Sequence, residues 1–448
     1  MNGGAPMPGS SHVAGPRSPE RSPSGPATAF VLTAAFAVFV LQLDIWAARQ
    51  GLLPGPPIAF LGAFAIATAI AVSRRPPARA GGAGLLGWLE AGAPFWGALL
   101  AYVAWGWLRA GLSLDPIYDL RLALLPGVDC LVILTGALAG SLRPLRRSWR
   151  GVAALAFGLL LASLLVDGWL PGTFSKQVSR AAGFAGNPNE GGLRLVLLAA
   201  ASLGYLRPRL RDLVILAGCG LGVFLTLSRG ALVLFALLGV VYGACLLLTA
   251  PWPRSRRTWI ALVLGSLGLT AVLAFAGFRW LPALPQFDTE HGQQRLSLLA
   301  SFGGFIQGAE GTRVQVLRDS LDEIAGRPLL GYGLGYSSTM NPGPHNQFLK
   351  IWLDQGAVGA GLSVLVLLGA AAVFLSRRSS TGLVFVALVA GKAFFSHNLI
   401  DDRTVLLLLG LLMSVSLGSG GGMEGREISA QRKSEIFEGM KPNTRGGA

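Results

Sequence analysis

Charged residues are scarce in this sequence. They make up 13% of the 448 residues, whereas hydrophobic residues make up 52%. Soluble domains carry roughly 25% charged residues, and several apolar runs here reach the about 20 helical residues that cross a hydrocarbon core. This balance excludes an ordinary soluble enzyme and predicts an all-α polytopic integral membrane protein.

Cysteine and histidine are also rare. The three cysteines, Cys130, Cys219 and Cys245, lie inside apolar runs without metal-ligand spacing, so we expect them to pack as small apolar side chains. The four histidines are His12, His291, His345 and His397. No Asp-x-Asp pair stands in a predicted outer loop. The sequence therefore predicts neither a metal site nor a cofactor.

The apolar runs predict about twelve transmembrane helices. They cover residues 27–47, 57–73, 93–112, 122–140, 151–170, 191–206, 211–227, 230–250, 258–279, 347–375, 381–399 and 403–418. About nine spans fall in 27–279 and about three in 347–418, separated by a large loop at 280–346. The ends, 1–26 and 419–448, are expected to be disordered cytoplasmic tails, with no cleavable signal peptide. We find no internal repeat.

The arginines predict an orientation for this bundle. With the N-terminus in the cytoplasm, every second connection is rich in arginine, as the positive-inside rule requires. These connections hold Arg74, Arg75, Arg79, Arg143, Arg146, Arg147, Arg150, Arg207, Arg209, Arg211, Arg254, Arg256, Arg257, Arg377 and Arg378. The net charge of +15 thus arises from topology and does not indicate nucleic-acid binding. Residues Arg180, Arg229 and 280–346 fall on the extracytoplasmic side.

The loop 280–346 is expected to be ordered, because long loops in compact folds are usually functional. Thr312 and Gln315 resemble a capping box that opens a helix. Apolar residues follow at spacings of three and four, namely Val314, Leu317, Leu321 and Ile324. With Arg313 and Arg318 beside this face, we expect an amphipathic helix along the membrane surface. Upstream, 296–306 is predicted to be interfacial or re-entrant.

His345 stands directly before a predicted span and follows Pro342 and Pro344. Proline favours the start of a helix, which places His345 and Asn346 at a helix mouth. The positive end of the helix dipole disfavours imidazolium, and a neutral imidazole can act as a general base. The alternative is a capping or packing histidine.

Other outer residues have a chemical and a structural interpretation. Arg229 could bind a diphosphate in a forked geometry or extend to lipid headgroups. Asn187 and Asn189 could bind sugar hydroxyls or form a turn. The glycines Gly331, Gly333 and Gly335 could turn their N–H groups to a phosphate or only allow tight turns. Within or near spans, Asp129 and Asp354 are expected to pair with arginine.

Over roughly residues 175–365, one ordered set of residues forms a recognisable pattern. It comprises Arg180, Gly183, Asn187, Pro188, Asn189, Ser228, Arg229, Gly230, Arg313, Pro328, Gly331, Tyr332, Gly333, His345, Asn346, Gly356 and Gly359. In order, spacing and sidedness, this pattern resembles that of the O-antigen ligase and polymerase superfamily. The twelve-span layout extends the resemblance to the whole chain.

The resemblance implies a metal-independent membrane glycosyltransferase of the GT-C type in the bacterial inner membrane, with its site on the periplasmic side. A glycan would pass from undecaprenyl diphosphate to a hydroxyl of lipid A–core in a ligase, or of another lipid-linked unit in a polymerase. His345 would be the base, and Arg229 and Arg313 would hold the diphosphate. The substrate-binding residues would be Arg180, Asn187, Asn189, Tyr332, Gly333 and Asn346.

Two alternatives remain. Within the family, the chain could be a repeat-unit polymerase, or a ligase for a protein or cell-wall acceptor. Outside it, the chain could be a transporter or flippase, which would show repeated halves and broken helices near the bilayer midplane. We find neither in the sequence, and the distinctive residues cluster at one surface.

Overall fold

The computed structural model describes residues 26–53, 56–73, 89–112, 120–175, 179–205, 209–249, 293, 302–396, 398–399 and 402–418, and these residues form helices without strands. The helices are α1 (Pro26–Val40), α2 (Leu43–Arg49), α3 (Pro57–Ser73), α5 (Ala93–Leu112), α6 (Leu120–Ser141), α7 (Arg143–Trp169), α8 (Pro188–Ser202), α9 (Leu210–Thr226), α10 (Arg229–Thr249), α13 (Phe302–Gly326), α14 (Gln347–Ser376), α15 (Ser380–Phe395) and α16 (Arg403–Gly418). The prediction of a helical protein is confirmed.

Among the described helices, three are long and apolar enough to cross a membrane. They are Leu124–Ser141, Pro144–Trp169 and Gln347–Ser376, and α1 with α2 would make a fourth as one bent span. Shorter apolar helices cover Pro57–Ser73, Arg229–Cys245, Ser380–Phe395 and Arg403–Gly418. These helices are consistent with a helical membrane protein. The predicted span at 258–279 lies outside the described residues.

Two spans predicted as continuous are broken in the structure. The span predicted at 27–47 bends by 61° between α1 and α2, where Gln42 adopts a left-handed conformation with φ 55°. The helix α14 is interrupted at Gly356, which has φ 70° and ψ −174°. The sequence analysis identified neither break, since hydropathy reports apolar length and not backbone conformation.

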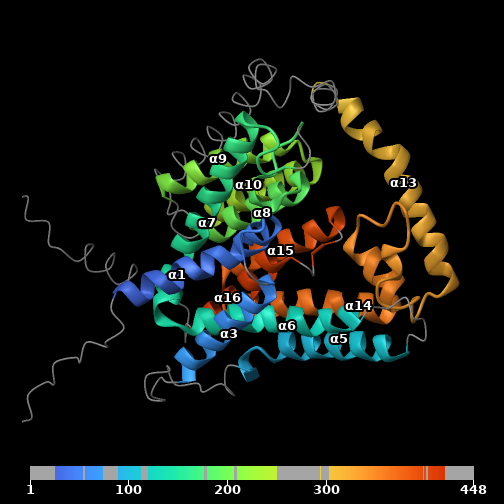
Figure 1. Ribbon diagram of the computed structural model, residues 1–448, viewed down its shortest axis with the longest axis horizontal. Coiled ribbons are helices and arrows are strands. Elements are labelled where there is room, and N and C mark those ends of the chain that lie inside the picture. The colour runs from blue at the N-terminus through green and yellow to red at the C-terminus, as the bar shows by residue number, and fades with distance from the viewer. Residues whose placement is uncertain are drawn as a thin grey trace, which may run out of the picture.

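Helix α13 also differs from its prediction. It begins at Phe302, so Thr312 does not open the helix. Of the predicted apolar face, Ile324 is buried, whereas Val314, Leu317 and Leu321 are 38%, 41% and 46% exposed. In Figure 1, α13 stands away from the main bundle. Its exposed apolar stripe is the side that a membrane-surface helix would turn to lipid, which stays a prediction.

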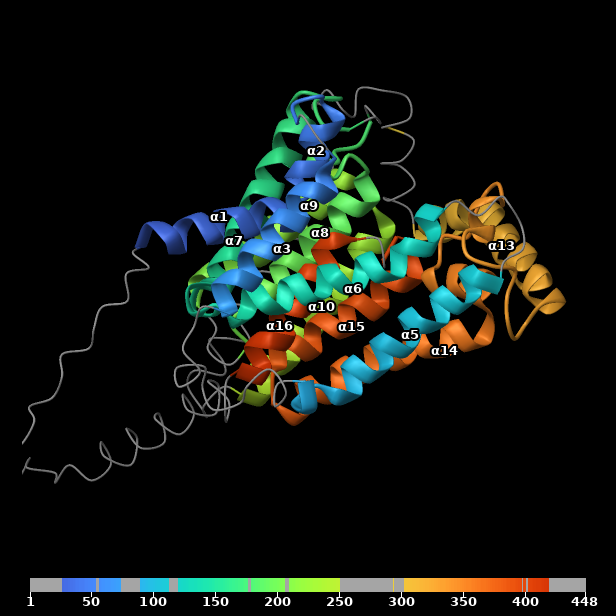
Figure 2. The same cartoon turned by 60° about the horizontal axis from the view of Figure 1, so that its bottom comes forward.

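The bundle contains two closely packed helix pairs, α5 with α14 and α6 with α16 (Figure 2). The α6–α16 crossing depends on glycine. A Cβ at Gly136 would clash with the Leu407 carbonyl oxygen, and a Cβ at Gly410 would clash with the Ile133 carbonyl oxygen. Small residues allow such close backbone contact between membrane helices. The crossing is therefore set by backbone contact.

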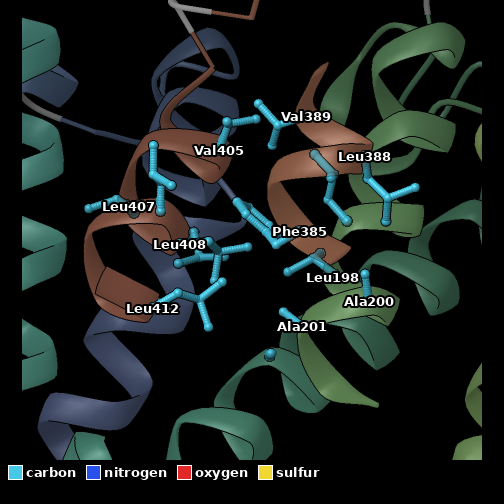
Figure 3. Packing of buried hydrophobic residues seen from close by; sticks show 14 of the residues in the cluster. Leu198, Ala200, Ala201, Phe385, Leu388, Val389, Val405, Leu407, Leu408 and Leu412 are labelled. Atoms are coloured by element: carbon cyan, nitrogen blue, oxygen red, sulfur yellow. The ribbon is translucent and has the colours of Figure 1, made fainter. Parts of the chain in front are cut away.

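Helix α8 lies at the centre of the structure. It packs against α7, α9, α10 and α15, and nearly all of its side chains are buried. Figure 3 shows the apolar residues that join α8 to α15 and α16, namely Leu198, Ala200, Ala201, Phe385, Leu388, Val389, Val405, Leu407, Leu408 and Leu412. This core holds the C-terminal half of α8 against α15 and α16, and the candidate site begins at the opposite, N-terminal end of α8.

Candidate functional site

Arg180 is buried beside the N-terminal end of α8. Its Nε donates to the carbonyl of Thr226 at 2.9 Å, and one terminal nitrogen donates to Asn189 Oδ1 at 2.7 Å. Thr226 is the last residue of α9 and Asn189 lies in the first turn of α8. The guanidinium thus joins two helix ends that are far apart in the sequence.

Arg229 lies at the same corner of the bundle. It is the first residue of α10 and is half-buried, and it follows Thr226, the partner of Arg180, by three positions. Between them, Ser228 accepts a hydrogen bond from the Ala231 N–H at 3.4 Å. The structure therefore brings together Arg180, Asn189 and the helix start that carries Arg229.

Asn187 has a structural role in this corner. It is the N-cap of α8, and its Oδ1 accepts a hydrogen bond from the Asn189 N–H at 2.9 Å. Of the two interpretations of Asn187, the turn accounts for its side-chain oxygen.

His345 and Asn346 lie at the mouth of α14, as predicted. Asn346 is the N-cap, and its Oδ1 accepts hydrogen bonds from the N–H groups of Phe348 at 2.8 Å and Leu349 at 3.3 Å. His345 immediately precedes this cap and is exposed. The proline-rich approach thus delivers an accessible imidazole to the N-terminal end of a long helix.

The glycine-rich stretch before His345 pairs with the break in α14. The bonds run from Tyr332 N–H to Leu353 O at 2.7 Å, from Gly333 N–H to Asp354 O at 2.9 Å and from Ala357 N–H to Pro328 O at 2.9 Å. They satisfy backbone groups that the break at Gly356 removes from helical pairing. A Cβ at Gly331 would lie 2.5 Å from the Gly356 nitrogen, and a Cβ at Gly356 would clash with the Leu329 carbonyl oxygen. The glycine-rich stretch and α14 can therefore approach each other only because both residues are glycine.

This pairing bears on the two interpretations of Gly331 and Gly333. The Gly333 N–H donates to the Asp354 carbonyl and the Gly331 N–H donates to the Arg327 carbonyl at 3.1 Å. Both groups are used within the chain, which supports the tight-turn alternative at these positions.

Tyr332 is packed into a cluster at the C-terminal end of α13. Its ring stacks on Tyr336 with centroids 4.3 Å apart, and the Arg327 guanidinium lies 5.1 Å from its centre. The Tyr332 hydroxyl donates to the Glu323 carbonyl at 2.9 Å, and the Tyr336 hydroxyl donates to the Glu323 carboxylate. The cluster fastens α13 to the glycine-rich stretch.

Asp354 differs from its prediction. Its carboxylate accepts hydrogen bonds from the Ser337 N–H at 2.7 Å and the Ser337 hydroxyl at 3.0 Å. Serine therefore takes the place of the expected arginine partner. The bond holds the turn between the tyrosine cluster and His345.

Arg313 lies within α13, but its side chain is outside the described residues, so its approach to Arg229 stays a prediction. In the part of the chain that the structure describes, no group of three His, Cys, Asp or Glu side chains could hold a metal ion.

The structure also contains a buried ionic cluster that the sequence pattern did not predict. Lys392 Nζ lies 3.0 Å from Glu190 Oε2 and also contacts the Asp402 carboxylate. Arg194 Nε lies 3.2 Å from the same Asp402 oxygen. The signal was present, because ionisable residues within apolar spans are expensive and usually paired.

Neighbouring cations control the pKa of Asp402 in this cluster. Burial raises the pKa of Asp402, but the neighbouring Arg194 and Lys392 outweigh this effect and hold the pKa below its usual value. Gln42 Nε2 also donates to Asp402 Oδ1 at 2.9 Å. The cluster consists of two acidic and two basic side chains, so its formal charge is zero.

Comparison with known families gives one match. The family model described as O-Antigen ligase matches residues 213–364. The match runs from α9 into α14 and includes Arg229, Arg313 and His345. A search of curated proteins finds no match. Residues 213–364 are therefore similar to the O-Antigen ligase family, and the resemblance of the chain to the O-antigen ligase and polymerase superfamily is confirmed.

Proposed function

We propose that this protein is a metal-independent ligase of the GT-C type that transfers a glycan from undecaprenyl diphosphate to a hydroxyl of lipid A–core. One arrangement carries the proposal. Arg180, Asn189 and Arg229 share a corner, and a connected loop joins this corner to the helix that begins after His345. The family match supports the donor class without distinguishing a ligase from a polymerase.

In this proposal the arginines act on the donor. Arg229 and Arg313 bind the diphosphate oxygens in a forked geometry. As the bond between the sugar and the diphosphate breaks, they stabilise the negative charge that develops on the leaving group. Arg180, held by Asn189 and Thr226, adds a fixed positive charge behind them.

His345 acts on the acceptor. Its neutral imidazole accepts the proton of the acceptor hydroxyl while the oxygen attacks the anomeric carbon. The new glycosidic bond forms as the diphosphate leaves with its electron pair, and direct displacement inverts the anomeric centre. The N-terminal end of α14 favours the neutral form of His345 before reaction.

The remaining predicted residues bind or shape the sugar site. Because the Asn346 oxygen caps α14, its amide NH2 is the group that would donate to a sugar hydroxyl. Asn187 and Asn189 would bind the sugar from the N-terminal end of α8, beside Arg180. Tyr332 and Gly333 would shape the site through the packed turn, since their hydroxyl and N–H groups bind within the chain.

We place the site at the periplasmic face of the bacterial inner membrane. The helix ends near Arg229 and His345 are those predicted to lie outside. At the other end of the bundle, Arg146 from an arginine-rich connection donates to the Gly418 carbonyl at 3.2 Å. This separation supports an outer site opposite an arginine-rich inner surface.

Deletion of the gene, followed by electrophoresis of the lipopolysaccharide, tests the acceptor. Complete loss of polymer on the core supports the ligase, whereas a core carrying a single unit identifies a polymerase. Purified protein given the defined donor and two rival acceptors, lipid A–core and a second lipid-linked unit, makes the same distinction in vitro. Transfer to neither acceptor contradicts the proposal.

A transporter is the alternative from another class, and the breaks at Gln42 and Gly356 are features that it would share. At Gly356, however, the glycine-rich stretch closes the break by backbone pairing. In transporters such breaks expose backbone groups to substrate or ions. Turnover of a lipid-diphosphate-linked glycan by the purified protein in detergent would exclude transport as the sole function.

A further inference from the structure

The buried ionic cluster of Glu190, Arg194, Lys392 and Asp402 has no part in the proposed chemistry. Lys392 is 0% exposed and Asp402 is 1% exposed. Burial of ions is expensive even when they are paired, and apolar residues of similar volume are often no less stable. A contribution to the stability of the fold therefore does not explain why ionisable residues lie at this position.

On one side, the cluster adjoins the corner that holds Arg180, Asn189 and Arg229, which we call the arginine corner. Glu190 follows Asn189, the residue that binds Arg180. Three residues after Lys392, Phe395 packs against the start of α10, where a Cβ at Gly230 would lie 2.8 Å from the Phe395 Cβ. Lys392 thus ties the corner that carries Arg180 and Arg229 to the end of α15.

On the other side, the cluster leads to the histidine. Ser396 Oγ donates to Glu190 Oε1 at 2.7 Å, and the Leu399 N–H donates to Gln347 Oε1 at 3.0 Å. Gln347 is the first residue of α14 and follows His345 by two positions. The connection between α15 and α16 therefore bridges the arginine corner and the histidine, and Lys392 and Asp402 hold its two ends.

We propose that Lys392, through its ion pairs with Glu190 and Asp402, is a positioning residue that sets the spacing between the arginine corner and His345. The inference rests on the proposed function. Displacement needs the acceptor oxygen aligned with the bond to the leaving diphosphate, and a misplacement of about 1 Å can reduce the rate about 100-fold. The ion pairs of Lys392 with Glu190 and Asp402 join α15 to the start of α8 and to the residue before α16, and so limit such a displacement.

The test compares two neutral double variants. Glu190→Gln with Lys392→Met removes the tie but leaves the pair of Arg194 and Asp402. The control, Asp44→Asn with Arg403→Met, removes another ion pair of the bundle, which joins α2 to α16 at 2.7 Å. A milder variant, Ser396→Ala, removes the hydrogen bond to Glu190 and the one that Ser396 Oγ accepts from the Asn398 N–H, but leaves the ion pairs of Lys392 in place. It serves if the first double variant does not fold.

Turnover and melting temperature are measured in detergent with an undecaprenyl-diphosphate-linked repeat unit as donor and lipid A–core as acceptor. We expect Glu190→Gln/Lys392→Met to lower kcat at least tenfold, with both KM values within about twofold of the wild type. Ser396→Ala should lower kcat about threefold. The control should lower the melting temperature but keep kcat within about twofold.

A distance measurement separates this inference from the proposed function. Spin labels replace the exposed residues Thr173 and Thr339 in a background in which the three cysteines are alanine. The distribution between them should broaden in Glu190→Gln/Lys392→Met and not in the control. Unchanged kcat, equal losses in both double variants, or an unchanged distribution would overturn the positioning role. If the wild type shows no turnover, the proposed function fails, while the distance still reports on the tie.

Discussion

The close contact of Gly331 with Gly356 allows us to calculate how much local stability the Gly356→Ala substitution would remove from the glycine-rich stretch. At φ 70° and ψ −174°, a backbone region essentially restricted to glycine, an alanine costs about 1–3 kcal/mol, and its Cβ would clash with the Leu329 carbonyl oxygen. Moving that chain away breaks the hydrogen bonds at 2.7, 2.9 and 2.9 Å between the glycine-rich stretch and α14. Each is worth about 1 kcal/mol. The stretch should therefore lose about 4–6 kcal/mol of local stability.

Hydrogen exchange measures this loss directly. Since about 1.4 kcal/mol corresponds to tenfold, the Tyr332 and Gly333 N–H groups should exchange about a thousandfold faster or more in Gly356→Ala, provided that they open locally. The matched control is Gly361→Ala in the same helix, where a Cβ would meet nothing within 4 Å. Alanine there should leave exchange unchanged or slower. Equal exchange in the two variants would refute the reasoning.

Three further predictions concern the proposed site and its support. His345→Ala should lower turnover by about 10²–10⁴-fold without changing the melting temperature, because the side chain is exposed; wild-type turnover would remove His345 as the base. Arg229→Lys should lose most activity because lysine lacks the forked geometry, whereas Arg318→Lys on the exposed side of α13 should retain it, and equal losses would contradict a specific role. Asp402 has a lowered pKa when folded, so its stabilising effect is present above its ordinary value of 3.8 and is lost as pH falls through the lowered value. Melting in acid should therefore decline more steeply in the wild type than in Asp402→Asn, and parallel curves would contradict this.

Local signals in the sequence predicted the elements that depend on neighbours in the chain. Apolar length predicted the helices, and the prolines before His345 predicted the start of α14. The same reasoning failed for Thr312, because a capping signal inside a longer helix has no means to stop it. It also failed at Gly356, whose partner Leu329 lies in another segment. A glycine within an apolar run does not reveal which backbone will approach it.

The sequence likewise identified some residues of the candidate site and its surroundings and missed others. The pattern singled out Arg180 and Asn189, and the structure brings them into contact. Glu190, the partner of Lys392, lies on α8, and four described helices separate it in the sequence from α15. No rule based on residue spacing could therefore identify the pair. The sequence showed only that charges inside apolar runs needed partners. Their identity follows from how α8 and α15 pack.

The zero formal charge of the cluster around Lys392 restricts how this protein can diverge. Loss of the lysine alone would strand an anion away from water, so a lineage could discard it only together with an acid. Related sequences should therefore exchange Glu190, Arg194, Lys392 and Asp402 in sets of opposite sign. A single change in this set would leave a buried charge without its partner and destabilise the protein, so selection should disfavour each intermediate sequence.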